Sequence, residues 1–192
     1  KEDEARAARD QYVDFKSDHI TLHNLLSRFL HEAEVNGGET GARRWAERTF
    51  LSFSVLKTAV GIRDQLQQQV GKLLFSTTTT STTAVNSDRF QNALEATRFC
   101  IVSGFFPHSA KRHKLGEYIT ILTNVPAQLP PTSALASTTT AEFLVYNELA
   151  MTAERSFLSI TTVADADWLV EASRGLFFIR GGGGGGQQQC QQ

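Results

Sequence analysis

The densest group of cations in the sequence is Lys111-Arg112-His113-Lys114, which lies between an expected helix and an expected strand. Three fixed positive charges on a loop can contact the phosphates of a nucleic-acid backbone, and nearby Tyr118 can stack on a base. The same cations can equally form a solvated turn, stabilised by the negative end of the preceding helix. The charge pattern therefore leaves two alternatives, an RNA contact and a solvated turn.

No other group of residues has the composition of a catalytic or metal site. His19 and His23 have the i, i+4 spacing of zinc ligands, but no HExxH glutamate stands between them and no third ligand is near. Ser103 is not set in a Gly-x-Ser-x-Gly elbow, so it is not expected to be a nucleophile. Cys100 lies in an apolar run and is expected to be a buried structural thiol. We therefore expect no catalytic residue and no metal ligand.

The composition is that of a folded intracellular protein. The chain has 192 residues, of which 41% are hydrophobic and 13 are phenylalanine, enough for one ordinary domain or two small ones. Its formal net charge is -1, so a nucleic-acid contact must come from a local group of cations. Two cysteines without a disulfide framework favour a reducing compartment, and no apolar stretch approaches the roughly 20 residues that cross a bilayer. The charged start without an initiator methionine suggests a domain of a longer protein.

The first half of the sequence has the period of amphipathic helices. A short charged helix is expected at 4–15, after which Ser17 or Asp18 can cap a second helix that Asn36-Gly37-Gly38 ends. Further helical patterns run through 42–53, 56–74 and 87–106. The polar tract at 76–84 has nothing to bury and is expected to be a flexible loop.

The second half changes to short runs rich in β-branched and aromatic residues. Strands are expected at 118–122, 143–146 and 157–163, and a helical turn is expected at 165–171. The run of glycines and the glutamine-rich end predict a disordered tail at 179–192. The sequence thus predicts an α+β protein with a helical domain at 1–95 and a small β domain, including its leading helix, at 96–178.

Several segments resemble one family pattern in order. They are Asp18–Asn24 with DHLTLLN, Trp45–Leu56 with WCxxNFLNYRSL, Ile62–Leu66 with IRxQL, Cys100–Phe106 with CxxGFF, Gly116–Thr120 with YxT, Leu129–Leu135 with IHPSSVL, Phe143–Glu148 with WVIYNE, and Trp168–Leu169 with WL. This pattern is similar to the C-terminal region of DEAH-box (DEAH/RHA) RNA helicases. The resemblance covers roughly residues 1–178.

The resemblance implies both a fold and a function. The helical domain would be a ratchet (HA2) domain, followed by a five-stranded oligonucleotide-binding (OB) barrel, and both would line a channel for single-stranded RNA. In the family, ATP and Mg²⁺ are bound by two RecA-like domains, and a winged-helix domain completes the channel. This chain has neither a phosphate-binding Gly-x-x-x-x-Gly-Lys-Ser/Thr loop nor a DEAH motif, so it should be inactive as an ATPase alone.

The implied partners are RNA, the other helicase domains and proteins of the spliceosome or of ribosome assembly. The implied location is nuclear, with the cytoplasm as the alternative, and no membrane is involved. Besides the cluster at 111–114 and Tyr118, the RNA-binding residues implied are Arg63, which would border the channel or form an intradomain salt bridge, Thr152 and Arg155.

Three positions depart from the family pattern. Ser54, Glu154 and Leu158 stand where the family has cations. A glutamate in place of a lysine removes a phosphate partner and adds repulsion. These departures favour an alternative function, in which a helicase-derived fragment serves as a non-catalytic docking or scaffold module of a ribonucleoprotein complex.

Overall fold

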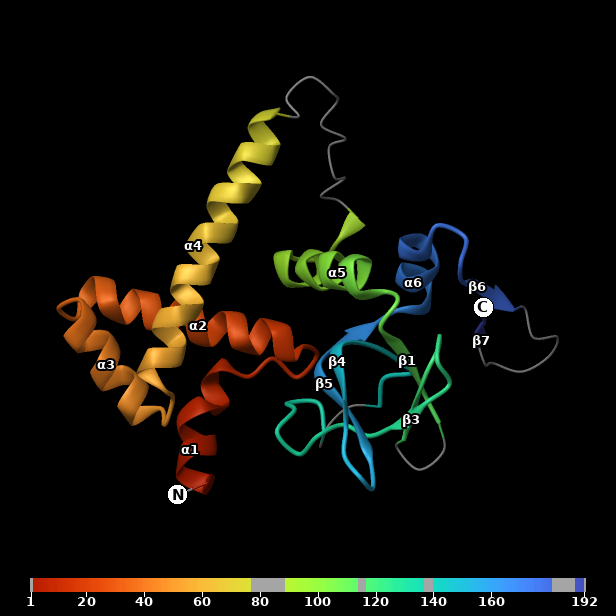
Figure 1. Cartoon of the computed structure of the whole chain (residues 1–192), viewed down its shortest axis with the longest axis horizontal. Coiled ribbons are helices and arrows are strands. Elements are labelled where there is room, and N and C mark those ends of the chain that lie inside the picture. Colours follow the sequence, from red (N-terminus) through yellow and green to blue (C-terminus); the bar gives the residue numbers. More distant parts are fainter. Residues whose placement is uncertain (1, 77–88, 114–116, 137–139, 181–188, 192) are drawn as a thin grey trace. The chain divides into compact units, whose positions relative to one another are not determined.

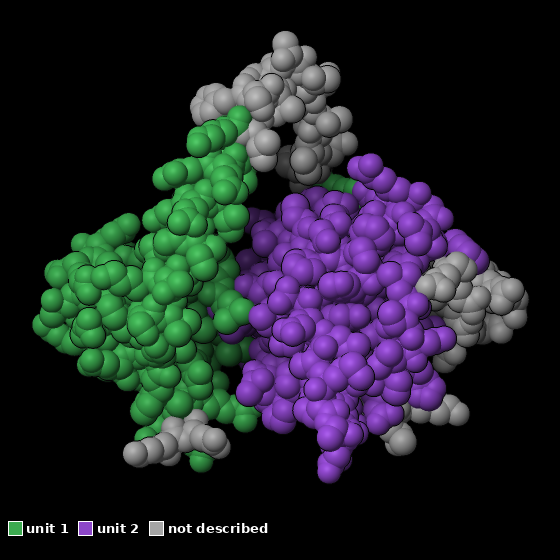
Figure 2. Space-filling view, viewed as in Figure 1, with its two compact units in different colours: residues 1–13, 22–89 green, residues 14–21, 90–192 purple. Residues whose placement is uncertain are grey.

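The computed structural model describes residues 2–76, 89–113, 117–136, 140–180 and 189–191 (Figure 1). The chain divides into two compact units (Figure 2). Unit 1 comprises residues 1–13 and 22–89, and unit 2 comprises residues 14–21 and 90–192. The predicted border between the domains was at 95/96, whereas the units divide at 89/90 and unit 2 also takes in residues 14–21.

Unit 1 is built from helices. They are α1 (Glu2–Arg9), the 3-10 helix η1 (Asp10–Tyr12), α2 (Asp18–Val35, from residue 22 onward), α3 (Glu39–Arg48) and α4 (Phe53–Ser76). Trp45 of α3 is the centre of the core and packs against Leu25 and Phe29 of α2. Its indole N–H donates to the Tyr12 hydroxyl at 3.3 Å, which satisfies the one polar atom of the ring.

Glycines allow the tight turn between α2 and α3. Gly37 and Gly38 have φ of 85° and 69°, the left-handed region that glycine enters without strain. The Gly38 N–H donates to the Ala33 carbonyl at 2.9 Å, so the predicted end of α2 is confirmed. Gly41, in the first turn of α3, lies against the backbone of Asn36, and an added Cβ would be 2.2 Å from the Asn36 carbonyl oxygen.

This close approach gives a testable prediction. Gly41→Ala is expected to lower the free energy of unfolding of unit 1 by about 1–3 kcal/mol, because a methyl group cannot fit against a backbone atom without moving the turn. Gly61→Ala in α4 is the control, since its added Cβ meets nothing within 4 Å. Urea unfolding followed through Trp45, with Trp168 replaced by phenylalanine in every variant, measures both. Equal stability of Gly41→Ala and its parent would contradict the close packing of Gly41 on Asn36.

Unit 2 is built around a five-stranded antiparallel sheet with the strand order β3-β2-β1-β4-β5. The strands are β1 (Ser109–Arg112), β2 (Tyr118–Thr120), β3 (Pro126–Ala127), β4 (Phe143–Met151) and β5 (Ser156–Ala164). Gln128, which follows β3, exchanges backbone hydrogen bonds of 2.9 Å with Ser156 and Leu158 of β5. The two edges of the sheet therefore meet, and the sheet curls as in an OB fold. The predicted α+β class with an OB-type β domain is confirmed.

The two faces of the sheet form separate cores. Along β4, Phe143 and Val145 belong to one cluster while Leu144 and Tyr146 belong to the other, as the alternation of a strand requires. The first cluster is covered by α5 (Ala93–Phe105) and α6 (Ala166–Ser173). Trp168 of α6 anchors this cover. Its ring meets the ring of Phe99 edge to face, with 5.8 Å between centroids.

The start of α2 is part of unit 2 rather than of the helical unit. The Lys16 carbonyl accepts from the Val163 N–H of β5 at 2.8 Å, and the hydroxyls of Ser17 and Thr162 are 2.7 Å apart. Ser17 also caps α2 as predicted, because its Oγ accepts from the Ile20 N–H at 3.1 Å. Asp18 is buried beside it and accepts four hydrogen bonds from distant residues.

Several local predictions require correction. The cations at 111 and 112 were placed on a loop, but they lie in β1, a central strand held by β2 on one side and β4 on the other. The helix expected at 87–106 begins at Ala93, where the Asn92 side chain caps it by accepting from Glu95 N–H at 2.9 Å. Cys100 on this helix was expected to be buried but is exposed.

The chain ends in a second small sheet. Its strands β6 (Phe178–Arg180) and β7 (Gln189–Gln191) pair antiparallel. Residues 179–180 and 189–191 of the tail predicted to be disordered thus lie in strands. Residues 181–188 and 192 lie outside the described residues, as does the polar tract from 77 to 84, so for these residues the predictions of a disordered tail and a flexible loop stay predictions.

Candidate nucleic-acid interface

The two cations of β1, Lys111 and Arg112, differ in exposure and in the contacts of their side chains. Lys111 is half-buried, with its Nζ 3.5 Å from the Glu142 carboxylate and 5.7 Å from the centroid of the Phe143 ring. Arg112 is exposed, and its Nη1 donates to the Thr140 carbonyl at 2.8 Å. Among the described residues, this contact to a neutral oxygen engages only one guanidinium N–H, so the others can donate to a phosphate. Arg112 is therefore the stronger candidate of the two.

The predicted site residues that follow Arg112 differ in their exposure. His113 is exposed, and its backbone N–H donates to the Glu117 carbonyl at 2.6 Å. Lys114 lies outside the described residues. Tyr118 is only 2% exposed, and its hydroxyl donates to the Ala141 carbonyl at 3.0 Å. The expectation that Tyr118 stacks on a base is therefore wrong, because its ring is part of the core beneath β1.

Thr152 and Arg155 lie in the turn that joins β4 to β5. The Thr152 hydroxyl donates to the Arg155 carbonyl at 2.8 Å and accepts from the Arg155 N–H at 3.0 Å. The Thr152 hydroxyl is thus engaged in holding the turn, while both residues are exposed. The Arg155 guanidinium reaches the Gln128 side-chain oxygen at 3.4 Å.

Gln128 joins this turn to the loop before β2. Its side-chain amide donates to the Glu117 carboxylate at 3.1 Å while its oxygen accepts from Arg155. His113 therefore lies on the same edge of the barrel as Arg155, through Glu117 and Gln128. We call His113, Glu117, Gln128, Thr152 and Arg155 the Gln128 rim. The structure thus brings predicted residues from two distant parts of the sequence to one place.

An exposed aromatic ring that sequence reasoning missed lies elsewhere on unit 2. His108 is exposed and stacks on Tyr146, with 5.3 Å between ring centroids and 12° between planes. Its Nδ1 is 3.2 Å from the Asn147 carbonyl oxygen, which fixes the ring. Burial raises the pKa of the Tyr146 hydroxyl, so this supporting ring is neutral. A flat ring held in this way can stack on a nucleobase, and no local sequence signal marks it.

Arg63 is the one predicted site residue that lies in unit 1. It lies in α4, and its guanidinium is 2.7 Å from the Asp64 carboxylate. Of the two roles considered for Arg63, an RNA contact and an intradomain salt bridge, the structure contains the salt bridge.

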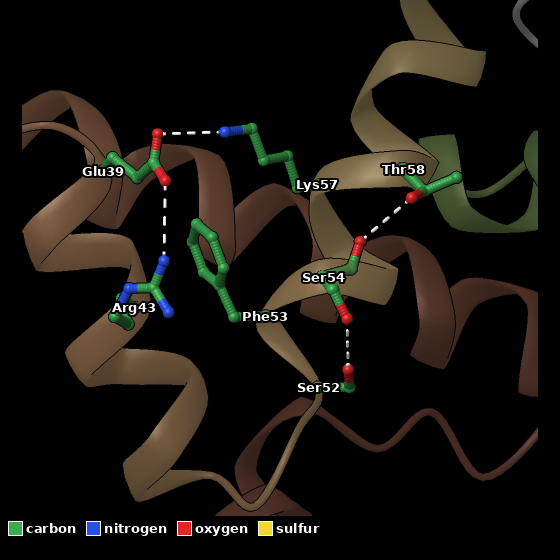
Figure 3. A pocket seen from close by; sticks show the side chains of 7 residues that line it. All are labelled: Glu39, Arg43, Ser52, Phe53, Ser54, Lys57 and Thr58. Carbon is green, nitrogen blue, oxygen red and sulfur yellow. Dashed lines mark hydrogen bonds and ion pairs between the residues drawn. The ribbon is translucent and has the colours of Figure 1, made fainter.

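Unit 1 has a pocket of about 560 Å³ at the start of α4 (Figure 3). It is lined by Glu39, Arg43, Ser52, Phe53, Ser54, Lys57 and Thr58. Sequence reasoning noted Ser54 only as a position where the family has a cation, so it did not find this pocket. Arg43 lies in α3 and Lys57 in α4, so the two cations come together only once these helices pack against each other.

The described residues contain no group of three histidine, cysteine or acidic side chains that could hold a metal ion. His19 contacts Thr162 Oγ1 through Nδ1 at 2.8 Å, while its buried Nε2 has no hydrogen-bond partner among the residues that the structure describes. Burial lowers the pKa of the His19 imidazole, and the neighbouring Asp18 carboxylate opposes this shift. Within the described part of the chain, helices long and apolar enough to cross a bilayer are absent.

Comparisons with known proteins agree with this fold. A sequence model of the family described as "Oligonucleotide/oligosaccharide-binding (OB)-fold" matches residues 97–176, which include the whole five-stranded sheet. The chain is 26% identical over 156 residues to the "Probable ATP-dependent RNA helicase DHX35" of Homo sapiens, covering 81% of this chain and 20% of that protein. The protein of the same name from Pongo abelii is also 26% identical, with 19% of its length covered.

These matches show which class of protein the chain is similar to. The resemblance to the C-terminal region of DEAH-box RNA helicases is confirmed, and that region contains an OB fold. More particularly, the chain spans about one fifth of the length of these two curated relatives, both described as probable ATP-dependent RNA helicases.

Proposed function

We propose that the chain is the auxiliary C-terminal region of an ATP-dependent DEAH-box RNA helicase and that its OB barrel binds single-stranded RNA without sequence specificity. The observation that supports this proposal is the Gln128 rim, where Gln128 and Glu117 link Arg155 to His113 on one edge of an OB-type barrel. Contacts to phosphates carry no base information, so binding through them tolerates any sequence.

The ATPase would belong to other domains of such a helicase. In this proposal, ATP and Mg²⁺ are bound by RecA-like domains, which together with a winged-helix domain and this chain enclose the RNA. Unit 1 would act as the ratchet beside the strand. The proposal extends to a nuclear location and to a role in pre-mRNA splicing or ribosome assembly, where spliceosomal or ribosome-assembly proteins would be further partners.

RNA binding by the barrel is expected to depend on few charges. Because the formal net charge is -1, the attraction must come from local cations such as Arg112 and Arg155. Two phosphate contacts predict that log affinity falls with log salt with a slope of about -1.4. This slope is shallow compared with that of a polybasic protein.

The proposal is tested by fluorescence anisotropy with a labelled oligouridine over a series of salt concentrations. Arg112→Gln and Arg155→Gln are each expected to weaken binding and to reduce the slope by about 0.7, because each removes one released counterion. Arg174→Gln, an equal charge change at the exposed end of α6, is the control and should leave the slope unchanged.

A second function is favoured by the acids near the candidate cations. Glu142 neutralises Lys111, and Glu117 lies within the Gln128 rim itself. A surface of mixed charge suits a protein partner, so the alternative is a docking or scaffold module of a ribonucleoprotein complex. Absence of oligouridine binding at low salt would reject the RNA-binding proposal and favour this alternative.

A further inference from the structure

Two cations in unit 1 converge on one anionic position. Lys57 Nζ is 3.0 Å from one carboxylate oxygen of Glu39, and Arg43 Nη2 is 3.6 Å from the other. Lys57 first, and then Arg43, holds the pKa of the Glu39 carboxyl below its usual range. Figure 3 shows the carboxylate between the two cations, at the edge of the pocket. The Glu39 carboxylate thus demonstrates that this arrangement can accommodate an anion.

The remaining lining groups suit a larger anion than a carboxylate. Ser52 and Ser54 share one hydrogen bond of 3.0 Å between their hydroxyls, which leaves one of the two protons to donate elsewhere. The Arg43 guanidinium lies 4.2 Å from the centroid of the Phe53 ring, and this stacking fixes its plane. The pocket therefore offers two cations, a hydroxyl donor and an aromatic wall.

We propose that this pocket binds a phosphate group, which replaces the Glu39 carboxylate between Lys57 and Arg43. Glu39 is 56% exposed at its side chain, and ion pairs of such exposure are weak, so the carboxylate can turn into solvent. Once the Glu39 carboxylate has turned away, Lys57 and Arg43 are both available to bind the phosphate. A volume of about 560 Å³ accommodates a phosphate together with the sugar attached to it. The phosphate can come from an RNA backbone or from a free phosphate compound.

Amide NMR spectra of the full chain test this proposal, with inorganic phosphate as the first probe. Saturable shifts are expected at the amides of 52–58. Lys57→Gln should abolish them, and Glu39→Gln should strengthen phosphate binding by about two- to fivefold, because it removes the competing carboxylate. Lys72→Gln is the matched control, since it makes the same charge change on the exposed far part of the same helix and should leave the shifts unchanged.

A second probe, a short oligouridine, distinguishes the sources. If the amides of 52–58 shift at a lower concentration of oligouridine than of inorganic phosphate, the site binds an RNA backbone. If they shift at a lower concentration of inorganic phosphate, the site binds a free phosphate compound. The proposal is overturned if neither probe moves these amides, or if Lys57→Gln leaves the shifts in place. All residues that line the pocket belong to unit 1, so Arg155→Gln should not alter the shifts at 52–58. Loss of RNA binding at the Gln128 rim can therefore be told apart from loss of phosphate binding at the pocket.

Discussion

Asp18→Ala is expected to lower the free energy of unfolding of unit 2 by about 3–5 kcal/mol, because it removes the shared acceptor of four donors, three buried and one partly buried. Asp18 as a whole residue is 9% exposed. It accepts from Ser133 Oγ at 2.7 Å, from Ala134 N–H at 2.8 Å, and from the N–H and Oγ1 of Thr161 at 2.9 and 3.0 Å. Without Asp18, these donors lose their partner where water does not reach them easily.

Urea unfolding of the full chain measures this effect, with Trp45 replaced by phenylalanine in every variant so that fluorescence reports Trp168 of unit 2. Asp18→Asn should also destabilise unit 2, since an amide presents donors to donors. Asp165→Asn is the control, because Asp165 is exposed and its side chain makes no capping hydrogen bond. Equal midpoints for Asp18→Ala and its parent would show that the four bonds contribute nothing to the fold.

Asp18 also shows where sequence reasoning stops. The pattern around it predicted a helix start with Ser17 or Asp18 as cap, and Ser17 does cap α2. The carboxylate of Asp18 instead binds residues at least 115 positions away in the sequence. Local spacing contains the information for a cap, because the partners of a cap are the next three residues. It contains none for a contact that only the folded barrel brings about.

The helices were predictable to different degrees. The apolar period of α4 predicted a helix, and a helix is present from Phe53 to Ser76. The same period suggested a buried face, yet Ile62, Leu66 and Val70 are each more than half exposed. Among the described side chains of α4, those that pack against the core around Trp45 are Phe53, Leu56 and Val60, in its first turns. Periodicity therefore identified the secondary structure, but it could not say how much of the helix another element covers.

The strand β1 was missed for a related reason. Its sequence, Ser-Ala-Lys-Arg, has neither the β-branched residues nor the alternation that mark a strand. It is a strand because β2 and β4 supply hydrogen-bond partners on both of its sides. This pairing outweighs the weak local propensity. As a consequence, Lys111 and Arg112 point to opposite faces of a strand rather than sharing a loop, and Arg112 is exposed while Lys111 is half-buried.

Leu158→Arg is expected to unfold the barrel, with a loss of more than about 4 kcal/mol, because a guanidinium cannot be buried unpaired in an apolar core. Leu158 is fully buried in the cluster that contains Leu144 and Tyr146. Met151→Arg is the matched control, since it places the same cation at a residue that is 72% exposed in the preceding strand. The fluorescence of Trp168 during urea unfolding reports both variants, and Leu158→Ala supplies a milder change of about 2–5 kcal/mol if the arginine variant does not fold.

This result bears on the choice between RNA binding and protein docking. Leu158 was interpreted as a position where a family cation has been lost. An arginine at this position could contact RNA only if the Leu158→Arg protein is folded and stable. Because the structure buries this position completely, no cation that contacts RNA can lie there in this fold. Of the departures in unit 2, only Glu154 is exposed, in the turn that also carries Thr152 and Arg155. Of these family departures, Glu154 alone therefore counts against RNA binding by the barrel, beside the acids Glu142 and Glu117 that already lie near the candidate cations.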